Sequence, residues 1–407
     1  MIKGKWITLG VTGGIAAYKA VDLVRQLRTR GAEVDVIMTK NAQQFVTPFT
    51  FQTVSGHPVY TDLFGSFKPE ISHISLAEKA DAFIIAPATA NIIAKIVSGL
   101  ADDLLSTVLL ATRAPVLIAP AMNDKMWENP VVKQNVAKLK ELGFEIVEPT
   151  SGELACGAEG KGRLADIEDI VKEIITILTK KDLKGERILI TTGPTHEPID
   201  PVRILTNRSS GKMGYALAQA SYRRGAEVML VSGPTNLKPI PHIHTISVGT
   251  SLEMSKAALK HYKSCSIAIK AAAVADYRPK KGLKDKMKKT HKTLSLELER
   301  NPDILYQMGK NKGKKILVGF AAETKNIISQ AKLKLDKKNL DLIVVNQVLQ
   351  KKGGFGSDNN EATLIDYEGR IDALPLMSKE ELADKIIDKI KELKDKKPAT
   401  KEPKKTT

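Results

Sequence analysis

A lone cysteine in a glycine-rich loop is the first residue of this sequence that could do chemistry. Cys156 lies in the string Gly152-Glu-Leu-Ala-Cys-Gly157, and Gly160 and Gly162 follow it. Glycines on both sides allow such a segment to move as a flap over a bound substrate. A single cysteine is usually small core filler, but burial is not expected in a polar loop. We therefore predict that Cys156 is a functional thiol.

A second group of interest is the turn Thr12-Gly13-Gly14-Ile15, between a buried-strand pattern and an amphipathic helix pattern. Glycines let the backbone approach a phosphate closely, and the start of a helix favours negative charge. The dinucleotide spacing G-x-G-x-x-G is absent, so a mononucleotide is favoured over NAD. A tight strand-to-helix turn that binds nothing would explain the same residues.

Two segments of the second half suit phosphorylated ligands. Ser209, Ser210 and Gly211 open a predicted helix, where hydroxyl and backbone donors suit a phosphate, although the same residues are common helix caps. Residues 280–292 hold seven Lys against one acid. Such charge would stabilise negative charge that migrates to a leaving pyrophosphate. For most of these lysines a solvated surface remains the alternative.

Overall composition limits the possible partners. Lys and Arg outnumber Asp and Glu by 63 to 46, a net charge of +17, which favours polyanionic partners. We predict small phosphorylated molecules rather than nucleic acid, because aromatic residues are only 5% of the chain and no nucleic-acid-binding motif is recognised. Two distant cysteines favour a reducing, cytoplasmic location. No apolar run approaches the roughly 20 residues that span a bilayer.

The elements that position these residues alternate between strands and helices, which predicts an α/β fold for both halves. A charged stretch at 180–186 predicts the boundary: a first domain at 1–180, a linker at 181–187, a second domain at 188–395 and a Lys-rich disordered tail at 396–407. The predicted strands are 6–11, 34–38, 82–86, 116–119 and 145–147 in the first half, and 188–191, 228–231, 267–271, 316–319 and 342–345 in the second. Helices are predicted at 15–30, 131–142 and 380–393.

Four strings of the first half together resemble the flavin-dependent cysteine decarboxylases. They are Thr12-Gly-Gly-Ile-Ala-Ala-Tyr-Lys19, Ala86-Pro-Ala-Thr-Ala-Asn91, Ala101-Asp-Asp-Leu-Leu-Ser-Thr107 and Pro120-Ala-Met-Asn-Asp-Lys-Met126. The resemblance covers nearly all of this half and implies a flavodoxin-like domain that binds FMN. The FMN-binding residues it implies are Gly13, Gly14, Ile15, Thr39, Thr89, Asn91 and Ser106.

The same resemblance assigns three catalytic residues. His73 matches the family's histidine, although a lone His at a helix start is more often solvated. Asn123 matches the asparagine that holds the substrate carboxylate, although it could also cap the helix that follows. Cys156 matches the cysteine that supplies a proton. Loss of CO2 from a cysteine derivative leaves carbanion character with no adjacent carbonyl, so an electron sink is needed, and the resemblance assigns that role to FMN.

Strings across the second half resemble the phosphopantothenate-cysteine ligases. They lie in Ile190–Met213, Ala271–Tyr277, Asn301–Ile304, Gly319–Thr324, Lys338–Leu342 and Gly354–Asn360. The resemblance implies that CTP, with Mg²⁺, converts a carboxylate to an acyl-cytidylate, from which the amine of cysteine displaces CMP. It identifies the chain as a bifunctional decarboxylase and ligase of coenzyme A biosynthesis. The rival enzyme hypothesis is a flavin protein that acts on another acid or a peptide thiol.

Ligase-site residues follow from the same likeness. Asn207 holds the activated acyl group, Lys286 steadies charge as pyrophosphate leaves, and Arg203 contacts substrate across a dimer interface, while Ser209 and Ser210 bind substrate. The implied nucleotide-binding residues are Ala271, Ala272, Asp276, Lys286, Pro302, Asp303, Ile304, Leu305, Phe320, Lys334 and Lys338. No residue is assigned to a metal.

One residue departs from the family pattern, and the sequence does not determine the oligomeric state. Lys270 stands where a small or apolar residue is usual, and it could crowd the base pocket, so the nucleotide preference is in doubt. The family pattern implies trimers of decarboxylase domains and dimers of ligase domains, and hence a closed homo-oligomer as large as a dodecamer.

Overall fold

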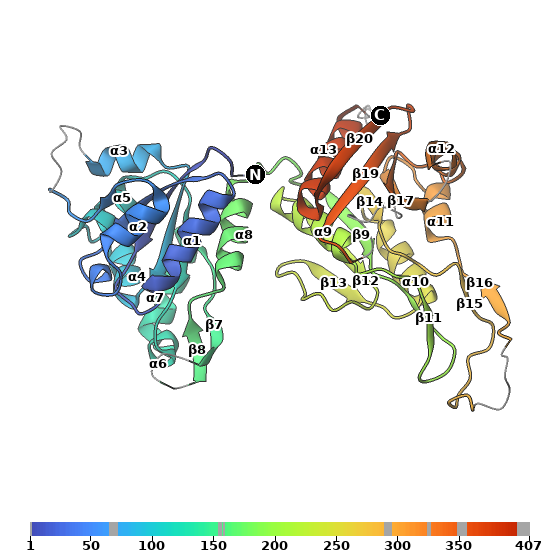
Figure 1. Ribbon diagram of the computed structural model, residues 1–407, viewed down its shortest axis with the longest axis horizontal. Helices are drawn as coiled ribbons and strands as arrows, with labels where there is room; N and C mark the ends of the chain where they lie inside the picture. Colours follow the sequence, from blue (N-terminus) through green and yellow to red (C-terminus); the bar gives the residue numbers. More distant parts are fainter. Residues whose placement is uncertain are drawn as a thin grey trace, which may run out of the picture. The chain divides into compact units, whose positions relative to one another are not determined.

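The computed structural model describes residues 2–64, 72–153, 157, 159–288, 295–323, 327–347 and 356–396. The chain divides into two compact units, Met1–Thr179 and Lys180–Thr407, and each is considered by itself (Figure 1). Cys156 and the predicted tail beyond Lys396 lie outside the described residues. Within the described ranges, no helix has the length and apolar character needed to cross a membrane.

The first unit is built on a six-stranded parallel sheet. Its strand order is β3-β2-β1-β4-β5-β6. Without the two-residue edge strand β3, this is the flavodoxin-like order. The bounds are β1 Trp6–Val11, β2 Glu33–Met38, β3 Val59–Tyr60, β4 Ala82–Ala88, β5 Val116–Pro120 and β6 Glu145–Ile146.

Helices cover both faces of this sheet, so the strands are apolar throughout. Along β4, Ile84 belongs to the core under one helical layer, whereas Phe83 and Ile85 belong to the core under the other. The first layer contains α1 Ala17–Thr29, α2 Pro48–Ser55 and α8 Ile167–Leu178, and the second contains α3 Ser72–Lys79, α4 Ala90–Ser98, α5 Leu104–Ala111 and α7 Pro130–Glu141.

Two short additions follow the later strands of this unit. Helix α6 (Asp124–Glu128) comes directly after β5. Strands β7 (Thr150–Glu153) and β8 (Glu159–Arg163) form an antiparallel pair, and the segment that joins them contains Cys156.

The second unit contains an eight-stranded sheet in the order β13-β12-β9-β14-β17-β18-β19-β20. The first six strands are parallel and the last two antiparallel. The bounds are β9 Arg187–Thr192, β12 Glu227–Ser232, β13 His244–Ser247, β14 Ile267–Lys270, β17 Ile316–Glu323, β18 Leu342–Gln347, β19 Asn359–Asp366 and β20 Ile371–Ser378.

Helices again cover both faces, and two strand pairs project from the carboxyl edge (Figure 1). One face carries α9 Lys212–Arg223 and α13 Lys379–Lys396, and the other carries α10 Ser251–Tyr262, α11 Ile304–Lys310 and α12 Ile327–Lys337. The strand pairs are β10 His196–Pro198 with β11 Ile204–Thr206, and β15 Tyr277–Pro279 with β16 Leu298–Arg300. The predicted α/β class, with a mainly parallel sheet in each half, is confirmed.

Each sheet has one topological switch point. Strands that come early in the chain are added on one side of it, and later strands are added on the other side. In the first unit this switch lies between β1 and β4, and in the second between β9 and β14. Loops that leave the carboxyl ends of two such strands diverge to opposite faces and leave a crevice for a ligand. The predicted site residues should therefore collect at these two edges.

Candidate functional site

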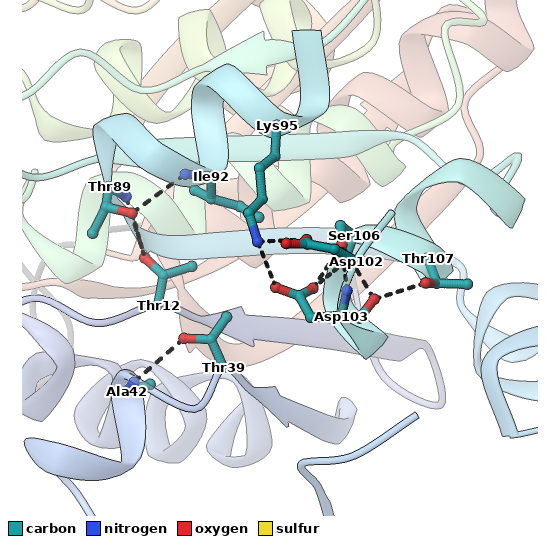
Figure 2. A network of polar contacts seen from close by, with 10 residues as sticks. All are labelled: Thr12, Thr39, Ala42, Thr89, Ile92, Lys95, Asp102, Asp103, Ser106 and Thr107. Atoms are coloured by element: carbon teal, nitrogen blue, oxygen red, sulfur yellow. Dashed lines mark hydrogen bonds and ion pairs between the residues drawn. The ribbon is translucent and has the colours of Figure 1, made fainter. Parts of the chain in front are cut away.

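Thr12 joins the two loops at the switch point of the first sheet. The residue follows β1 and is buried, with 2% exposure. Its hydroxyl donates to the carbonyl of Pro87 at 2.6 Å and accepts from the backbone N–H of Thr89 at 3.2 Å. Figure 2 shows Thr12 beside Thr89. Because these loops are 75 residues apart in the chain, one hydroxyl fixes the shape of the crevice. The prediction included Thr89 but not Thr12.

Helix α4 starts at this edge and turns its free N–H groups toward it. Thr89 caps the helix through its hydroxyl, which accepts from the N–H of Ile92 at 3.4 Å. Asn91, in the first turn, is exposed. Unpaired N–H groups at a helix start attract phosphate, so Thr89 and Asn91 lie where a phosphorylated cofactor would be held.

The loop after β1 approaches the loop after β2 too closely for any side chain at Gly13. A Cβ atom there would lie 2.4 Å from the Cβ of Asn41 and 2.9 Å from its carbonyl carbon. Thr39 is in the same loop as Asn41 and accepts from the N–H of Ala42 at 3.3 Å. Ile15 is 58% exposed, an apolar surface beside the crevice. Loops after three neighbouring strands therefore supply the predicted cofactor residues.

The Ser106 side chain takes part in the N-terminal cap of helix α5. Its hydroxyl lies 2.7 Å from the carboxylate of Asp103 and accepts from the N–H of Asp103, which forms a capping box at the start of α5. Lys95 bridges Asp103 at 3.1 Å and Asp102 at 2.5 Å (Figure 2). Burial pushes the pKa of Asp103 upward, but hydrogen bonds from Ser106 and Lys95 hold it below its usual value. Ser106 therefore positions α5, and its hydroxyl has partners within the chain.

His73 and Asn123 each lie at the start of a helix of this unit. His73 is the second residue of α3, which precedes β4, and it is partly buried. Asn123 follows β5 and caps α6, since its Oδ1 accepts from the N–H of Lys125 at 2.9 Å. The capping alternative for Asn123 is thus realised, and it fixes the side chain at the carboxyl edge of β5.

The β7–β8 pair lies directly on the Asn123 loop. The N–H of Met122 donates to the carbonyl of Gly162 at 2.9 Å. A Cβ on Gly162 would lie 2.2 Å from the carbonyl oxygen of Met122, and one on Gly160 would lie 2.6 Å from the Cβ of Asp124. The two glycines thus allow the strands that flank the Cys156 segment to dock on the loop that carries Asn123.

Replacing Gly162 by alanine should displace this strand pair. The rigid carbonyl of Met122 cannot make room for a methyl group at 2.2 Å, so we expect a cost of about 1–3 kcal/mol for overpacking and at least a tenfold loss of decarboxylation. Lys161→Ala is the control, because Lys161 lies in β8 beside Gly162 and its side chain forms an exposed ion pair with Glu148. Steady-state decarboxylation and thermal melting would measure both effects. Wild-type decarboxylation by Gly162→Ala would contradict the docking role.

In the second unit, loops after β9, β11 and β14 meet at the switch point. Thr195 is buried, and its hydroxyl accepts from the N–H of Ala275 at 3.1 Å. The Nδ2 of Asn207 donates to the carbonyls of Ala273 at 3.2 Å and Val274 at 3.1 Å. Asn207 is exposed, and the two backbone carbonyls hold its amide at the surface of this edge.

The start of α9 lies beside the same edge and carries the predicted serines. The hydroxyl of Thr192 donates to the carbonyl of Gly211 at 2.9 Å. Gly211 has φ +75°, a backbone conformation that favours glycine. Its N–H lies 3.4 Å from the hydroxyl of Ser209. Ser209 and Ser210 thus precede the free N–H groups of α9, as a phosphate subsite requires.

The predicted nucleotide residues fall into two kinds. Asp303 caps α11 by accepting from the N–H of Tyr306 at 3.0 Å, and it pairs with Lys338 at 2.9 Å. Burial raises the pKa of Asp303, but Lys338 and the Tyr306 N–H outweigh it and keep the pKa below its usual value. By contrast Ile304 and Leu305, at 2% and 5% exposure, belong to the core. Only their backbone can contact a ligand.

Lys270 lies among these residues. It ends β14 on the sheet face that α11 and α12 cover, and its Nζ donates to the carbonyl of Ala272 at 2.8 Å. Burial, and secondarily the nearby Lys338, lowers the pKa of Lys270 to about 8. Asp303 opposes that shift. The residue that departs from the family pattern therefore lies within the predicted nucleotide site.

Asp200 is a positioning residue that was not predicted. It is 3% exposed, and its carboxylate accepts from the N–H groups of Val202 and Arg203 at 2.8 Å and of Met287 at 3.2 Å. Arg203 also pairs with it at 3.2 Å. Burial raises the pKa of Asp200, but these donors outweigh it and the pKa is lowered. One carboxylate thus fixes Arg203 and the neighbour of Lys286.

Converting Asp200 to asparagine should loosen this loop. The asparagine amide cannot accept from every one of these donors. Loss of a hydrogen bond to a charged group changes the equilibrium between the ordered and disordered loop by about tenfold or more. We expect amide formation by the ligase to fall by about that factor, with decarboxylation unchanged. Asp285→Asn is the control, since it makes the same charge change at an exposed position two residues before Met287. If both variants ligate at the wild-type rate, Asp200 has no positioning role.

Metal ligands do not cluster in the described parts of the chain. Within those ranges, no group of three or more His, Cys, Asp or Glu side chains could hold a metal ion.

Two family models match the chain, one to each unit. Residues 1–179 match the family described as flavoprotein, and residues 183–393 match the C-terminal domain of the DNA/pantothenate metabolism flavoproteins. The two matches together cover nearly the whole described chain.

Curated relatives match over almost their full length. The chain is 48% identical over 395 residues to the coenzyme A biosynthesis bifunctional protein CoaBC of Bacillus subtilis, covering 96% of this chain and 97% of that protein. It is 45% identical to CoaBC of Escherichia coli, with 96% and 97% covered. Among solved structures, the C-terminal domain of a CoaBC protein aligns with 44% identity, TM-score 0.46, over 53% of this chain and 99% of that one.

Proposed function

The chain belongs to the family of bifunctional coenzyme A biosynthesis proteins, with a phosphopantothenoylcysteine decarboxylase half and a phosphopantothenate-cysteine ligase half, and we propose that CTP drives the ligase and FMN serves the decarboxylase. The observation that carries this proposal is the 48% identity that extends through both halves. The product of ligation is then the substrate of decarboxylation within one chain.

The carboxyl edge of the first sheet fits FMN. Loops after β1, β2 and β4 meet there, Gly13 lets the first two of these loops approach each other closely, and the capped start of α4 offers N–H groups for a phosphate. Gly13, Gly14, Ile15, Thr39, Thr89 and Asn91 would hold the cofactor. Ser106 would act indirectly, through the start of α5. When bound, FMN supplies the electron sink that amino-acid side chains lack.

Decarboxylation also needs groups that bind the carboxylate and move a proton. We assign the carboxylate to Asn123, because a neutral amide suits a group that leaves as uncharged CO2. Cys156, in the segment of sequence between β7 and β8, is assigned to proton delivery, and His73 at the start of α3 to the same site. The docking of β8 on the Asn123 loop supports a shared site for Asn123 and Cys156.

The second edge fits a nucleoside triphosphate and an acid substrate. We propose that Asn207 holds the activated acyl group and that Ser209 and Ser210 bind the phosphate of 4'-phosphopantothenate. Lys286 stands in an exposed Lys-rich loop and would stabilise the leaving pyrophosphate, with Mg²⁺ on the triphosphate. The remaining nucleotide contacts are assigned to Ala271, Ala272, Asp276, Lys334, Lys338, Phe320 and the backbone of Pro302–Leu305.

We also propose a homo-oligomer in the cytoplasm, with ligase units paired through their projecting strands. The two strand pairs contact each other, and exposed apolar side chains gather on them and their loops. Such surface is typical of a protein interface. The exposed apolar side chains are Val202, Ile204, Tyr277, Leu283, Leu296 and Leu298. Arg203 lies between β10 and β11 and would reach the partner's substrate. Light scattering would test the assembly, and a stable monomer would exclude it.

One incubation tests both activities. Purified protein would receive 4'-phosphopantothenate, cysteine, magnesium and either CTP or ATP, and products would be followed by mass spectrometry. We expect CTP to give 4'-phosphopantetheine and the protein to carry a flavin spectrum. If neither nucleotide gives even the 4'-phosphopantothenoylcysteine amide, the ligase proposal fails. If ATP alone works, the nucleotide assignment is wrong.

A further inference from the structure

Lys270 occupies an unusual place for a lysine. It is the last residue of the central strand β14, after three fully buried residues, and its side chain is only partly exposed. Its recorded hydrogen bond is to the carbonyl of Ala272, two residues further on. A strand end at a switch point is where ligands bind in such sheets.

Four charged side chains interact electrostatically with Lys270. Lys334 and Lys338 face it from α12 and the residue after it, and Asp303 from the start of α11. Asp276 faces it from the loop after β14. Asp303 is already paired with Lys338 at 2.9 Å. The cluster therefore keeps net positive charge around a lysine that is poorly hydrated.

We propose that Lys270 is a nucleotide-binding residue of this chain, whose ammonium group contacts the bound nucleotide and must be charged for tight binding. This inference rests on the proposed function of the ligase site. A nucleoside triphosphate brings several acceptors and negative charge to this positively charged cluster. Among the described residues Lys270 forms no ion pair with a carboxylate, so its ammonium group can receive them.

The proposal makes binding depend on pH in a window set by Lys270. Burial, with help from Lys338 and Lys334, lowers its pKa to about 8 in the free protein, whereas Asp303 and Asp276 raise it. A bound anion favours the charged form and would raise this pKa. Nucleotide binding should therefore take up a proton at a pH just above 8.

Three variants of the full chain separate the possibilities. Titration calorimetry with CTP and magnesium, without 4'-phosphopantothenate, would be run at pH 7.5 and 9.5. We expect Lys270→Met to bind about tenfold more weakly at pH 7.5 and to approach wild type at pH 9.5. Lys270→Arg keeps its charge at both pH values and should bind equally well at both. Lys270→Ala should resemble the methionine variant.

Proton uptake gives a second readout. At pH 8.5, in buffers of different ionisation enthalpy, wild type should take up a fraction of a proton on binding CTP, whereas the methionine and arginine variants should take up none. Wild-type affinity and proton uptake in Lys270→Met would overturn the inference. Tighter binding by Lys270→Ala would also overturn it and show that the side chain crowds the pocket.

Stability provides the control for misfolding. The folded-state pKa of about 8 lies below the ordinary 10.5 of an unfolded lysine, so the charged lysine costs stability below pH 8 and that cost disappears between pH 8 and 10.5. Without nucleotide, Lys270→Met should therefore melt higher than wild type at pH 7. A more stable variant that binds CTP more weakly indicates a binding role. If wild type neither binds nucleotide nor forms the amide, the proposed function fails instead.

Discussion

Replacing Cys156 by serine should stop 4'-phosphopantetheine from forming while ligation continues. A hydroxyl is a much weaker acid than a thiol, and loss of a positioned proton donor costs about 10²- to 10⁴-fold in rate. We expect CO2 to be released from 4'-phosphopantothenoylcysteine in a burst, without the reduced product. Quenched reactions analysed by mass spectrometry, with trapped CO2 counted in parallel, would show this separation.

The second cysteine is a matched control for the first. Cys265 is 8% exposed, donates to the carbonyl of Tyr262 at 3.3 Å, and has its pKa raised to about 11, chiefly by burial. A thiol with that pKa is inert at neutral pH. Cys265→Ser should therefore keep both activities and lose about 1 kcal/mol of stability. If Cys156→Ser makes 4'-phosphopantetheine at the wild-type rate, Cys156 is not the proton donor.

Replacing Asn207 by alanine should have the opposite selectivity. Both carbonyls that Asn207 holds, on Ala273 and Val274, belong to the loop after β14. Alanine would release that loop and remove the amide from the acyl group, and loss of one preorganised polar contact to a reacting acyl group costs about 10²- to 10³-fold. Amide formation from 4'-phosphopantothenate, cysteine and CTP should fall by that factor. Decarboxylation of supplied 4'-phosphopantothenoylcysteine should not change.

Asn311→Ala is the matched control for this change. Asn311 is exposed and donates to the backbone carbonyl of Gln307 at the end of α11, which precedes β17 and so lies at the amino edge of the sheet. It loses the same kind of hydrogen bond, far from the switch point. We expect wild-type ligation. Equal ligation by the Asn207 and Asn311 variants would remove Asn207 from the ligase site.

Strands β3, β13, β19 and β20 were not predicted, but five parallel strands of each sheet could be predicted from the sequence because they are mostly buried on both faces. Such strands appear as short apolar runs, and 6–11 matches β1 while 342–345 lies within β18. The antiparallel pairs β7–β8, β10–β11 and β15–β16 were not predicted, because their strands are short and largely exposed. The β7–β8 pair, with four glycines among residues 150–163, has no alternating pattern to detect.

The sequence by itself determined the fold class and the strings that assign the family, since both depend on residue types at fixed local spacing. Only the tertiary structure decided what each side chain does. Ser106 holds α5, Leu305 fills the core, and Thr12 joins two loops 75 residues apart. Asp200 contacts Met287 across 87 residues. Local sequence patterns cannot predict such partners, because the packing of segments far apart in the chain determines which groups meet. The same holds for Lys270, whose role depends on the charges that α11 and α12 bring to the end of β14.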